Sequence, residues 1–199
     1  TYGLPRFESA GFLARFPFAT ISLEDPDIPL DTRITGWSPF IPGDEDHSSL
    51  PVGALEYTFA NNTSQTVEAL FSFNTVNFMR IYVPSEWGSY APGDQIKDID
   101  NGFVLHQERT ADNPHFAGDF AVFTTADGAI VDHCWFRGGW WDPLTITWKN
   151  IENMDPRSTP PQEGHAPGAS LYLPFKLQAG EEITIPVLLA WYVPESDLS

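Results

Sequence analysis

The sequence is short of several features on which common classes of protein depend. Its one cysteine, Cys134, rules out an internal disulfide. Ten lysine and arginine residues stand against 27 aspartate and glutamate residues, which gives a formal net charge of −17. Such a chain repels the phosphate backbone of nucleic acids and the anionic surface of a membrane. No apolar run approaches the roughly 20 residues that a transmembrane helix needs. We therefore expect neither nucleic acid as a partner nor a transmembrane segment.

Motifs for metal, cofactor and covalent chemistry are also missing. The five histidines show no His-x-x-x-His or paired Cys/His spacing, which argues against a zinc site. No Gly-x-Ser-x-Gly turn or phosphate-binding glycine loop occurs. Cys134 lies beside His133 in a strand-like run, where neighbours point to opposite faces, so this histidine is badly placed to activate the thiol. We expect no cofactor, no metal and a buried, inert Cys134.

What the sequence does contain is typical of an all-β protein. It has 15 glycines, 18 prolines and many short runs of β-branched and aromatic residues between them. Roughly ten strands are predicted, which favours a two-sheet antiparallel β-sandwich in one domain over residues 1–199. Without a signal-peptide pattern, the compartment stays open, with a soluble, cytoplasmic protein favoured. The strands are expected at 16–23, 31–37, 52–59, 67–73, 77–83, 103–108, 119–125, 130–136, 171–177 and 183–191.

Three local predictions follow from the patterning. The alternating runs 52–59 and 67–73 flank turn-forming residues, so we expect them to pair as an antiparallel hairpin. Asp142 and Pro143 suit the start of a helix, and the apolar spacing after them predicts one short helix at 143–153. Residues 1–11, 84–100 and 154–168 show no periodic apolar pattern and are expected to be loops.

The most distinctive stretch is the loop of residues 37–51. Three prolines fix its backbone, while Gly43 and the aspartates permit turns, so it should be stiff rather than floppy. One half is apolar and the other is acidic, and a rigid loop between strands is a common place for an interaction surface. A structural corner with a solvated acidic tip, or less favourably a calcium site at 44–46, explains the same residues. The residues that would make the contact are Trp37, Phe40, Ile41, Asp44 and Asp46.

Carboxylates and aromatic residues are plentiful but do not define a catalytic site. A retaining glycosidase needs two carboxyls about 5–5.5 Å apart, and a sequence with 27 acids cannot show which of them converge. Trp135 and Trp191 fall within predicted strands and are expected in the core. The loop tryptophans that could stack on a sugar ring, or pack beneath a loop or a second domain, are Trp87, Trp140 and Trp141.

Several of these segments carry a family resemblance. The motifs are Arg15-Phe-Pro-Phe-Ala-Thr-Ile-Ser-Leu, Trp37-Ser-Pro-Phe-Ile-Pro-Gly-Asp, Ser48-Ser-Leu-Pro-Val-Gly-Ala-Leu-Glu-Tyr, Leu144-Thr-Ile-Thr-Trp-Lys-Asn-Ile and Ile185-Pro-Val-Leu-Leu-Ala-Trp-Tyr-Val-Pro. They closely resemble the N-terminal domain of glycoside hydrolase family 116, which includes the non-lysosomal glucosylceramidases and bacterial β-glucosidases. The resemblance covers nearly the whole chain, and the loop motif at 37–44 is its most specific part.

The resemblance implies a role that the residues alone do not supply. In this family the N-terminal β-sandwich packs against a helical (α/α)6 domain, which carries the catalytic carboxylates and hydrolyses β-glucosides with retention. No segment here is predicted to form that helical domain, so we expect no catalytic residue in this chain. The expected role is a non-catalytic partner domain of a β-glucosidase, with residues 37–46 near the domain contact. A free-standing carbohydrate-binding sandwich, or a purely structural interaction module, is the alternative.

Overall fold

The fold is described from a computed structural model, which defines residues 4–84, 89–112, 114–139 and 142–195. The elements in chain order are β1 (Ser9–Arg15), β2 (Phe18–Glu24), β3 (Asp31–Trp37), α1 (Glu45–Ser48), β4 (Val52–Ala60), β5 (Val67–Val76), β6 (Tyr82–Val83), β7 (Ser89–Tyr90), β8 (Asp94–Ile99), β9 (Gly102–Gln107), the 3-10 turn η1 (Pro114–Phe116), β10 (Gly118–Phe123), β11 (Ile130–Asp132), α2 (Pro143–Glu152), β12 (Gly168–Leu177) and β13 (Glu182–Tyr192).

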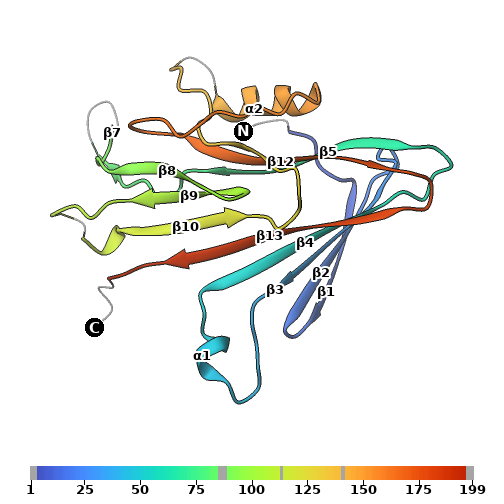
Figure 1. Cartoon of the computed structure of the whole chain (residues 1–199), viewed down its shortest axis with the longest axis horizontal. Coiled ribbons are helices and arrows are strands. Elements are labelled where there is room, and N and C mark those ends of the chain that lie inside the picture. The colour runs from blue at the N-terminus through green and yellow to red at the C-terminus, as the bar shows by residue number, and fades with distance from the viewer. Residues whose placement is uncertain (1–3, 85–88, 113, 140–141, 196–199) are drawn as a thin grey trace.

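Two antiparallel sheets make up the body of the molecule, as the sequence predicts (Figure 1). The large sheet has the order β1-β2-β3-β4-β13-β10-β9-β8, and the small sheet has the order β11-β12-β5. Strands β6 and β7 form a separate two-stranded ribbon. The all-β sandwich is therefore confirmed.

The core lies where the small sheet covers the large one. Its buried residues come mainly from alternate positions of β5, β9, β10, β12 and β13: Phe71, Phe103, Leu105, Val122, Leu171, Leu173, Ile185 and Val187. Aromatic rings join the two sheets, with the ring of Tyr57 4.8 Å from that of Phe71 and the ring of Phe59 5.2 Å from that of Phe175. Core residues occupy alternate positions because successive side chains of a strand point to opposite faces of its sheet.

The predicted hairpin between 52–59 and 67–73 is wrong, because β4 lies in the large sheet and β5 in the small one. The connection between them is an arch that carries the chain across the core, and a second arch carries it from β12 to β13. Asn61 is fully buried where the arches meet, and its Nδ2 donates to the carbonyls of Gln65 (2.8 Å) and Leu177 (3.0 Å). Two strands that face each other across a sandwich show the same alternation as two strands paired in one sheet, so the pattern could not separate these arrangements.

Other differences lie at the margins of the sheets. Residues 1–11 and 84–100 were expected to be loops, yet they contain the start of β1 and all of β8, the two edge strands of the large sheet. The strand expected at 77–83 is reduced to β6, and the one expected at 130–136 ends after three residues at Asp132. Edge strands need fewer apolar residues than central strands, so their patterns are weaker.

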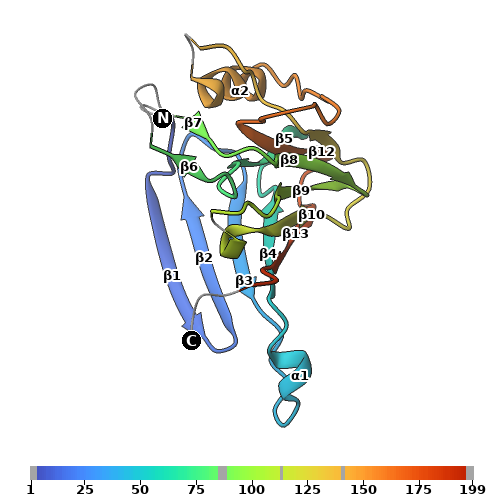
Figure 2. The ribbon, with the colours of Figure 1, turned by 90° about the vertical axis from the view of Figure 1, so that its left-hand side faces the viewer.

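Helix α2 is confirmed close to its predicted bounds. Asp142 is its N-cap, with Oδ1 accepting from the backbone N–H of Leu144 at 3.1 Å, and Pro143 fills the first turn. The helix lies on the outer side of the small sheet (Figures 1 and 2). In the described part of the chain, no helix has both the length and the apolar character needed to cross a membrane.

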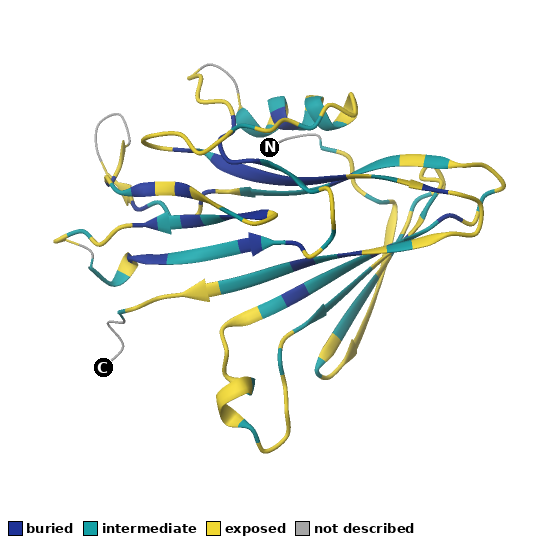
Figure 3. Cartoon of the chain, in the orientation of Figure 1, coloured by how far each residue is buried: buried dark blue, intermediate teal, exposed yellow. Residues whose placement is uncertain are grey.

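One side of the large sheet extends beyond the sandwich. Figure 2 shows β1, β2 and β3 spreading away from the small sheet, and Figure 3 shows that buried residues concentrate on the other strands. Because paired residues share a face, the register places Phe12, Ile21 and Ile34 on the same face as the core residue Tyr57. None of the described core residues comes from β1, β2 or β3. The core face thus continues onto three strands that the small sheet does not cover.

Candidate functional site

The loop singled out by the sequence projects from the end of the large sheet. Residues 38–51, called here the projecting loop, join β3 to β4, and Figure 2 shows α1 within it, well away from the sandwich. Trp37 lies at its root rather than at its tip. The indole Nε1 donates to Glu56 Oε1 at 3.1 Å, and Trp37 pairs with Ala54, which is buried. Trp37 therefore anchors the loop to the sheet.

Hydrogen bonds within the projecting loop fix its shape. The backbone N–H of Asp44 donates to the carbonyl of Ile41 at 3.0 Å, and Gly43 between them has a φ of 81°. The Ser48 hydroxyl accepts from the backbone N–H of Ile41 at 2.9 Å. A φ of this sign favours glycine, so Gly43 suits this turn. The tip is consequently formed before any partner arrives.

The two aspartates of the predicted contact have different roles. Asp44 is the N-cap of α1, with Oδ1 accepting from the backbone N–H of His47 at 3.0 Å and Oδ2 lying 2.8 Å from the His47 ring Nδ1. These bonds, the backbone bond first, hold the pKa of the Asp44 carboxyl below its usual value. Asp46 is exposed and forms no ion pair with another described residue. Asp44 therefore shapes the loop, and Asp46 is free to meet a partner.

Apolar side chains from two segments meet at the end of the sheet. The ring of Phe16, from the β1–β2 turn, packs edge-on against the ring of Phe40 at 4.7 Å. Phe16 is 78% exposed and Phe40 48%, and the neighbouring Ile41 is also exposed. We call Phe16, Phe40 and Ile41 the aromatic tip. Phe16 was not among the predicted contact residues, since a contact between residues so far apart in the chain leaves no local pattern.

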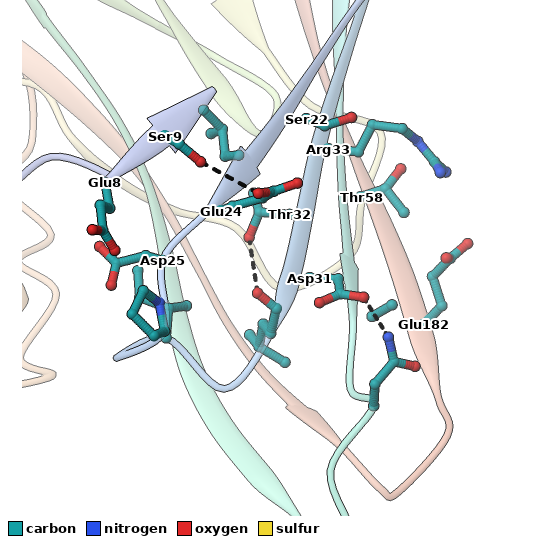
Figure 4. Close-up of a pocket in the computed structure, with 16 residues that line it drawn as sticks. Glu8, Ser9, Ser22, Glu24, Asp25, Asp31, Thr32, Arg33, Thr58 and Glu182 are labelled. Carbon is teal, nitrogen blue, oxygen red and sulfur yellow. Dashed lines mark hydrogen bonds between the residues drawn. The ribbon is translucent and has the colours of Figure 1, made fainter. Parts of the chain in front are cut away.

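A pocket of about 790 Å³ opens on the outer face of β2, β3 and β4 (Figure 4). Its lining is acidic, and Arg33 is the one basic residue among the described residues that line it. Figure 4 shows Glu8 and Asp25 on one side and Asp31 and Glu182 on the other. Several of these carboxylates accept local hydrogen bonds: Glu24 from the Ser9 hydroxyl at 3.3 Å, Asp25 from the backbone N–H of Asp27 at 3.0 Å and Asp31 from the side chain of Asn62.

The chemistry of this pocket does not match that of a glycosidase centre. Such a centre keeps one carboxyl protonated by low-polarity surroundings while the other stays ionised. None of the five pocket carboxylates, Glu8, Glu24, Asp25, Asp31 and Glu182, is buried. Across the described residues, no three His, Cys, Asp or Glu side chains converge as metal ligands would. The pocket is an anionic hollow held together by turn and strand contacts.

Two acids are buried among the described residues, Asp94 and Asp132, and Asp132 supports a loop. Asp132 is 3% exposed, and Oδ1 accepts from the backbone N–H of Cys134 at 3.2 Å. Burial raises the pKa of the Asp132 carboxyl, although a hydrogen bond from the Thr159 side chain opposes this. The neighbouring His133 donates its backbone N–H to the Thr159 carbonyl at 2.9 Å. These contacts fasten the loop around Thr159 to the end of β11. Perturbed acids occur at structural as well as catalytic positions, and this one is structural.

Cys134 and the tryptophans complete the set of predicted residues. Cys134 is buried, as expected, and its Sγ lies 3.1 Å from Arg137 Nε. Trp135 is buried, as expected, but Trp191 is 50% exposed, so its placement in the core is wrong. The sugar-stacking candidates Trp87, Trp140 and Trp141 lie outside the described residues.

Trp191 is exposed because β13 extends beyond the small sheet. Trp191 lines an apolar hollow of about 460 Å³. Exposed aromatic residues from two other segments, 78–82 and 115–117, line the same hollow: Phe78, Tyr82 and Phe116.

Comparison with known families gives one match that spans almost the entire chain. The family model described as beta-glucosidase 2, glycosyl-hydrolase family 116 N-term, matches residues 4–199. A search of curated proteins found no match.

Proposed function

This chain belongs to glycoside hydrolase family 116 as one of its N-terminal domains, and from that premise we propose that residues 1–199 form a single, non-catalytic β-sandwich domain of a retaining β-glucosidase. We propose further that it packs against an (α/α)6 catalytic domain, in the same or a partner chain, through the aromatic tip and the projecting loop.

The observation that carries the proposal is the aromatic tip. Two phenylalanines from separate segments pack on each other and still leave much of their surface in water. Surface apolar residues are common singly, but a paired aromatic patch on a projection is typical of a contact site. The hydrogen bonds that preform the loop reduce the entropy lost on docking, so more of the contact energy is available for affinity.

The predicted contact residues take different parts in this proposal. Phe40 and Ile41, with Phe16, are exposed anchors that docking would bury, and Trp37 and Asp44 hold the loop in shape. Asp46 lies on α1 at the acidic rim. Because the chain carries a net charge of −17, the facing surface of the catalytic domain should be neutral or basic around its apolar centre.

The test is binding of the chain to a separately expressed family 116 catalytic domain. Phe40→Ala and Phe16→Ala should each raise Kd at least about tenfold, since central aromatic anchors dominate interfaces. Trp37→Ala should also weaken binding by loosening the root of the loop. The matched control is Ile28→Ala, an exposed apolar residue in the β2–β3 connection, which should change Kd by less than about twofold. An unchanged Kd for Phe40→Ala would reduce the loop to a structural corner.

A second test addresses catalysis by the chain itself. Purified 1–199 should show no turnover of an aryl β-glucoside at high protein concentration, since none of the described pocket carboxylates is buried. Activity that survives purification and is abolished by Glu24→Gln or Asp31→Asn would overturn the non-catalytic role.

The narrower substrate is also a proposal. The family description names a beta-glucosidase, and we infer from the resemblance that glucosylceramide is among the β-glucosides that the parent enzyme hydrolyses. The measurement is hydrolysis of glucosylceramide, beside an aryl β-glucoside, by the catalytic domain with and without this chain. Aryl-glucoside activity without glucosylceramide activity would restrict the enzyme to simple glucosides.

A further inference from the structure

Strand β1 offers an unusually open edge. It is the outermost strand of the large sheet, it pairs only with β2 among the described strands, and all seven of its residues are exposed. Its register with β2 runs without a bulge from Ser9 to Arg15, and the strand contains no proline or lysine. The edge strands of a sheet usually carry a bulge, a proline or a lysine, which keeps their unpaired backbone groups from bonding to another strand. This edge is therefore suited to strand addition.

The charges at the two ends of the β1–β2 hairpin indicate which strand fits. Arg15 forms no ion pair with any described residue, although the chain has few cations and many acids. At the other end, Glu24 pairs with Ser9 across the two strands, and the Ser9 hydroxyl donates to Glu24 Oε2 at 3.3 Å. Glu24 itself is exposed, so its carboxylate can also receive an incoming cation. An antiparallel copy of β1 would bring the unpaired cation of one chain to this acid of the other.

We propose that β1 pairs antiparallel with β1 of a second copy of this chain, about a twofold axis at Phe12, so that the two large sheets become continuous. A partner strand pointing the same way would place Arg15 beside Arg15, so like charges oppose a parallel arrangement.

The self-pairing register is consistent at each position. With Phe12 opposite Phe12, Leu13 lies opposite Gly11, where the space at the Cβ position is empty, and Ala14 lies opposite Ala10. Arg15 then lies opposite Ser9 and on the same face, with Glu24 one strand further. Two strand spacings are about 10 Å, and the side chains of arginine and glutamate together span that distance over the small Ser9. Symmetry forms this ion pair twice, as an isologous dimer requires.

Sedimentation velocity over a range of chain concentrations tests the dimer, at about 0.15 M salt so that the long-range repulsion of two acidic chains is screened. Arg15→Glu and Glu24→Arg should each raise the dimer dissociation constant at least about fivefold, since each removes two ion pairs and sets like charges together. The double variant Arg15→Glu/Glu24→Arg restores opposite charges and should return the constant to within about twofold of the original.

Two controls separate the edge from general effects of charge. Arg33→Glu changes the net charge as Arg15→Glu does, but lies on β3, and should leave the dimer unchanged. Phe12→Asp places two carboxylates at the twofold axis and should abolish the dimer, with circular dichroism confirming that the sheet remains. A chain that stays monomeric at every concentration overturns the proposal. A dimer whose dissociation constant is unchanged by Phe12→Asp also overturns it, because another surface would then be responsible. The same holds if the double variant dimerises as weakly as the single variants. This proposal does not depend on the catalytic domain and can fail or succeed without it.

Discussion

The two halves of the large sheet both carry apolar residues on the same face but differ in what lies over that face. On β9, β10 and β13 several inward residues, Phe103, Leu105 and Val187 among them, are fully buried beneath the small sheet. On β1, β2 and β3 the same face carries Phe12, which is 70% exposed, with Ile21 and Ile34 half-buried. Alternation therefore shows that a face is apolar without showing what covers it. A covered face stabilises the fold, and an uncovered one is available for contact.

The largest expected difference between the halves is in the cost of losing a phenylalanine. Phe103→Ala removes a fully buried ring and should lower the free energy of unfolding by about 3–5 kcal/mol. Phe12→Ala, on the open half, should lower it by less than about 1 kcal/mol, because most of that ring is already in water. Urea unfolding of both variants gives the comparison. Equal costs would mean that β1 is covered in solution, as the proposed dimer would cause, so the measurement belongs at concentrations where the chain is monomeric.

A smaller loss of unfolding free energy is expected at the two arches that connect the sheets. Asn61→Ala deletes the side-chain donor to the carbonyls of Gln65 and Leu177 and should cost about 1–3 kcal/mol of unfolding free energy. Asn62→Ala is the matched control, since that residue is exposed and its side chain donates to Asp31, which is also exposed, and the change should cost less than about 0.5 kcal/mol. If both variants cost the same, Asn61 does not join the arches.

The smallest effect is a difference in pH dependence between one acid of each region. Burial raises the pKa of Asp132, so its contribution to stability is present below pH 3.8 and is lost as pH rises through the raised value. The bonds from His47 lower the pKa of Asp44, so its contribution is present above pH 3.8 and is lost as pH falls through the lowered value. Relative to the unsubstituted chain, Asp132→Asn should thus gain stability with rising pH, and Asp44→Asn should lose it. Unfolding curves from neutral pH to below 3.8 would show slopes of opposite sign, and slopes of the same sign would contradict this account.

The sequence was sufficient for what depends on local patterning. Asp142 and Pro143 defined the start of α2, and the prolines around Phe40 predicted a stiff, shaped loop. The sequence was insufficient wherever the structure depends on a contact with a distant segment of the chain. The run from Val52 and the run from Val67 alternate alike, and only the pairing of β4 with β3 and β13, and of β5 with β12, shows that they belong to different sheets.

The same limit explains the missed parts of the candidate site. Strand β1 was missed in part because Phe12 and Leu13 point to opposite faces and both are exposed, which leaves no alternation to detect. Phe16 was missed as a contact residue because its packing on Phe40 joins two segments of the chain. Trp191 was misplaced because its strand continues beyond the sheet that covers the rest of it.

The arches also determine the order in which the chain can assemble as it leaves the ribosome. Strands β1 to β4 are sequential neighbours, so this four-stranded meander can close as soon as about the first third of the chain has emerged. Its next neighbour is β13, with Glu182 opposite Ala60, and the small sheet waits for β12. During most of synthesis the nascent chain therefore holds β4 with an unpaired inner edge and a bare apolar face. Exposed surface of this kind is what chaperones protect, and domains built by late, long-range pairing depend on that protection more than domains built from local hairpins.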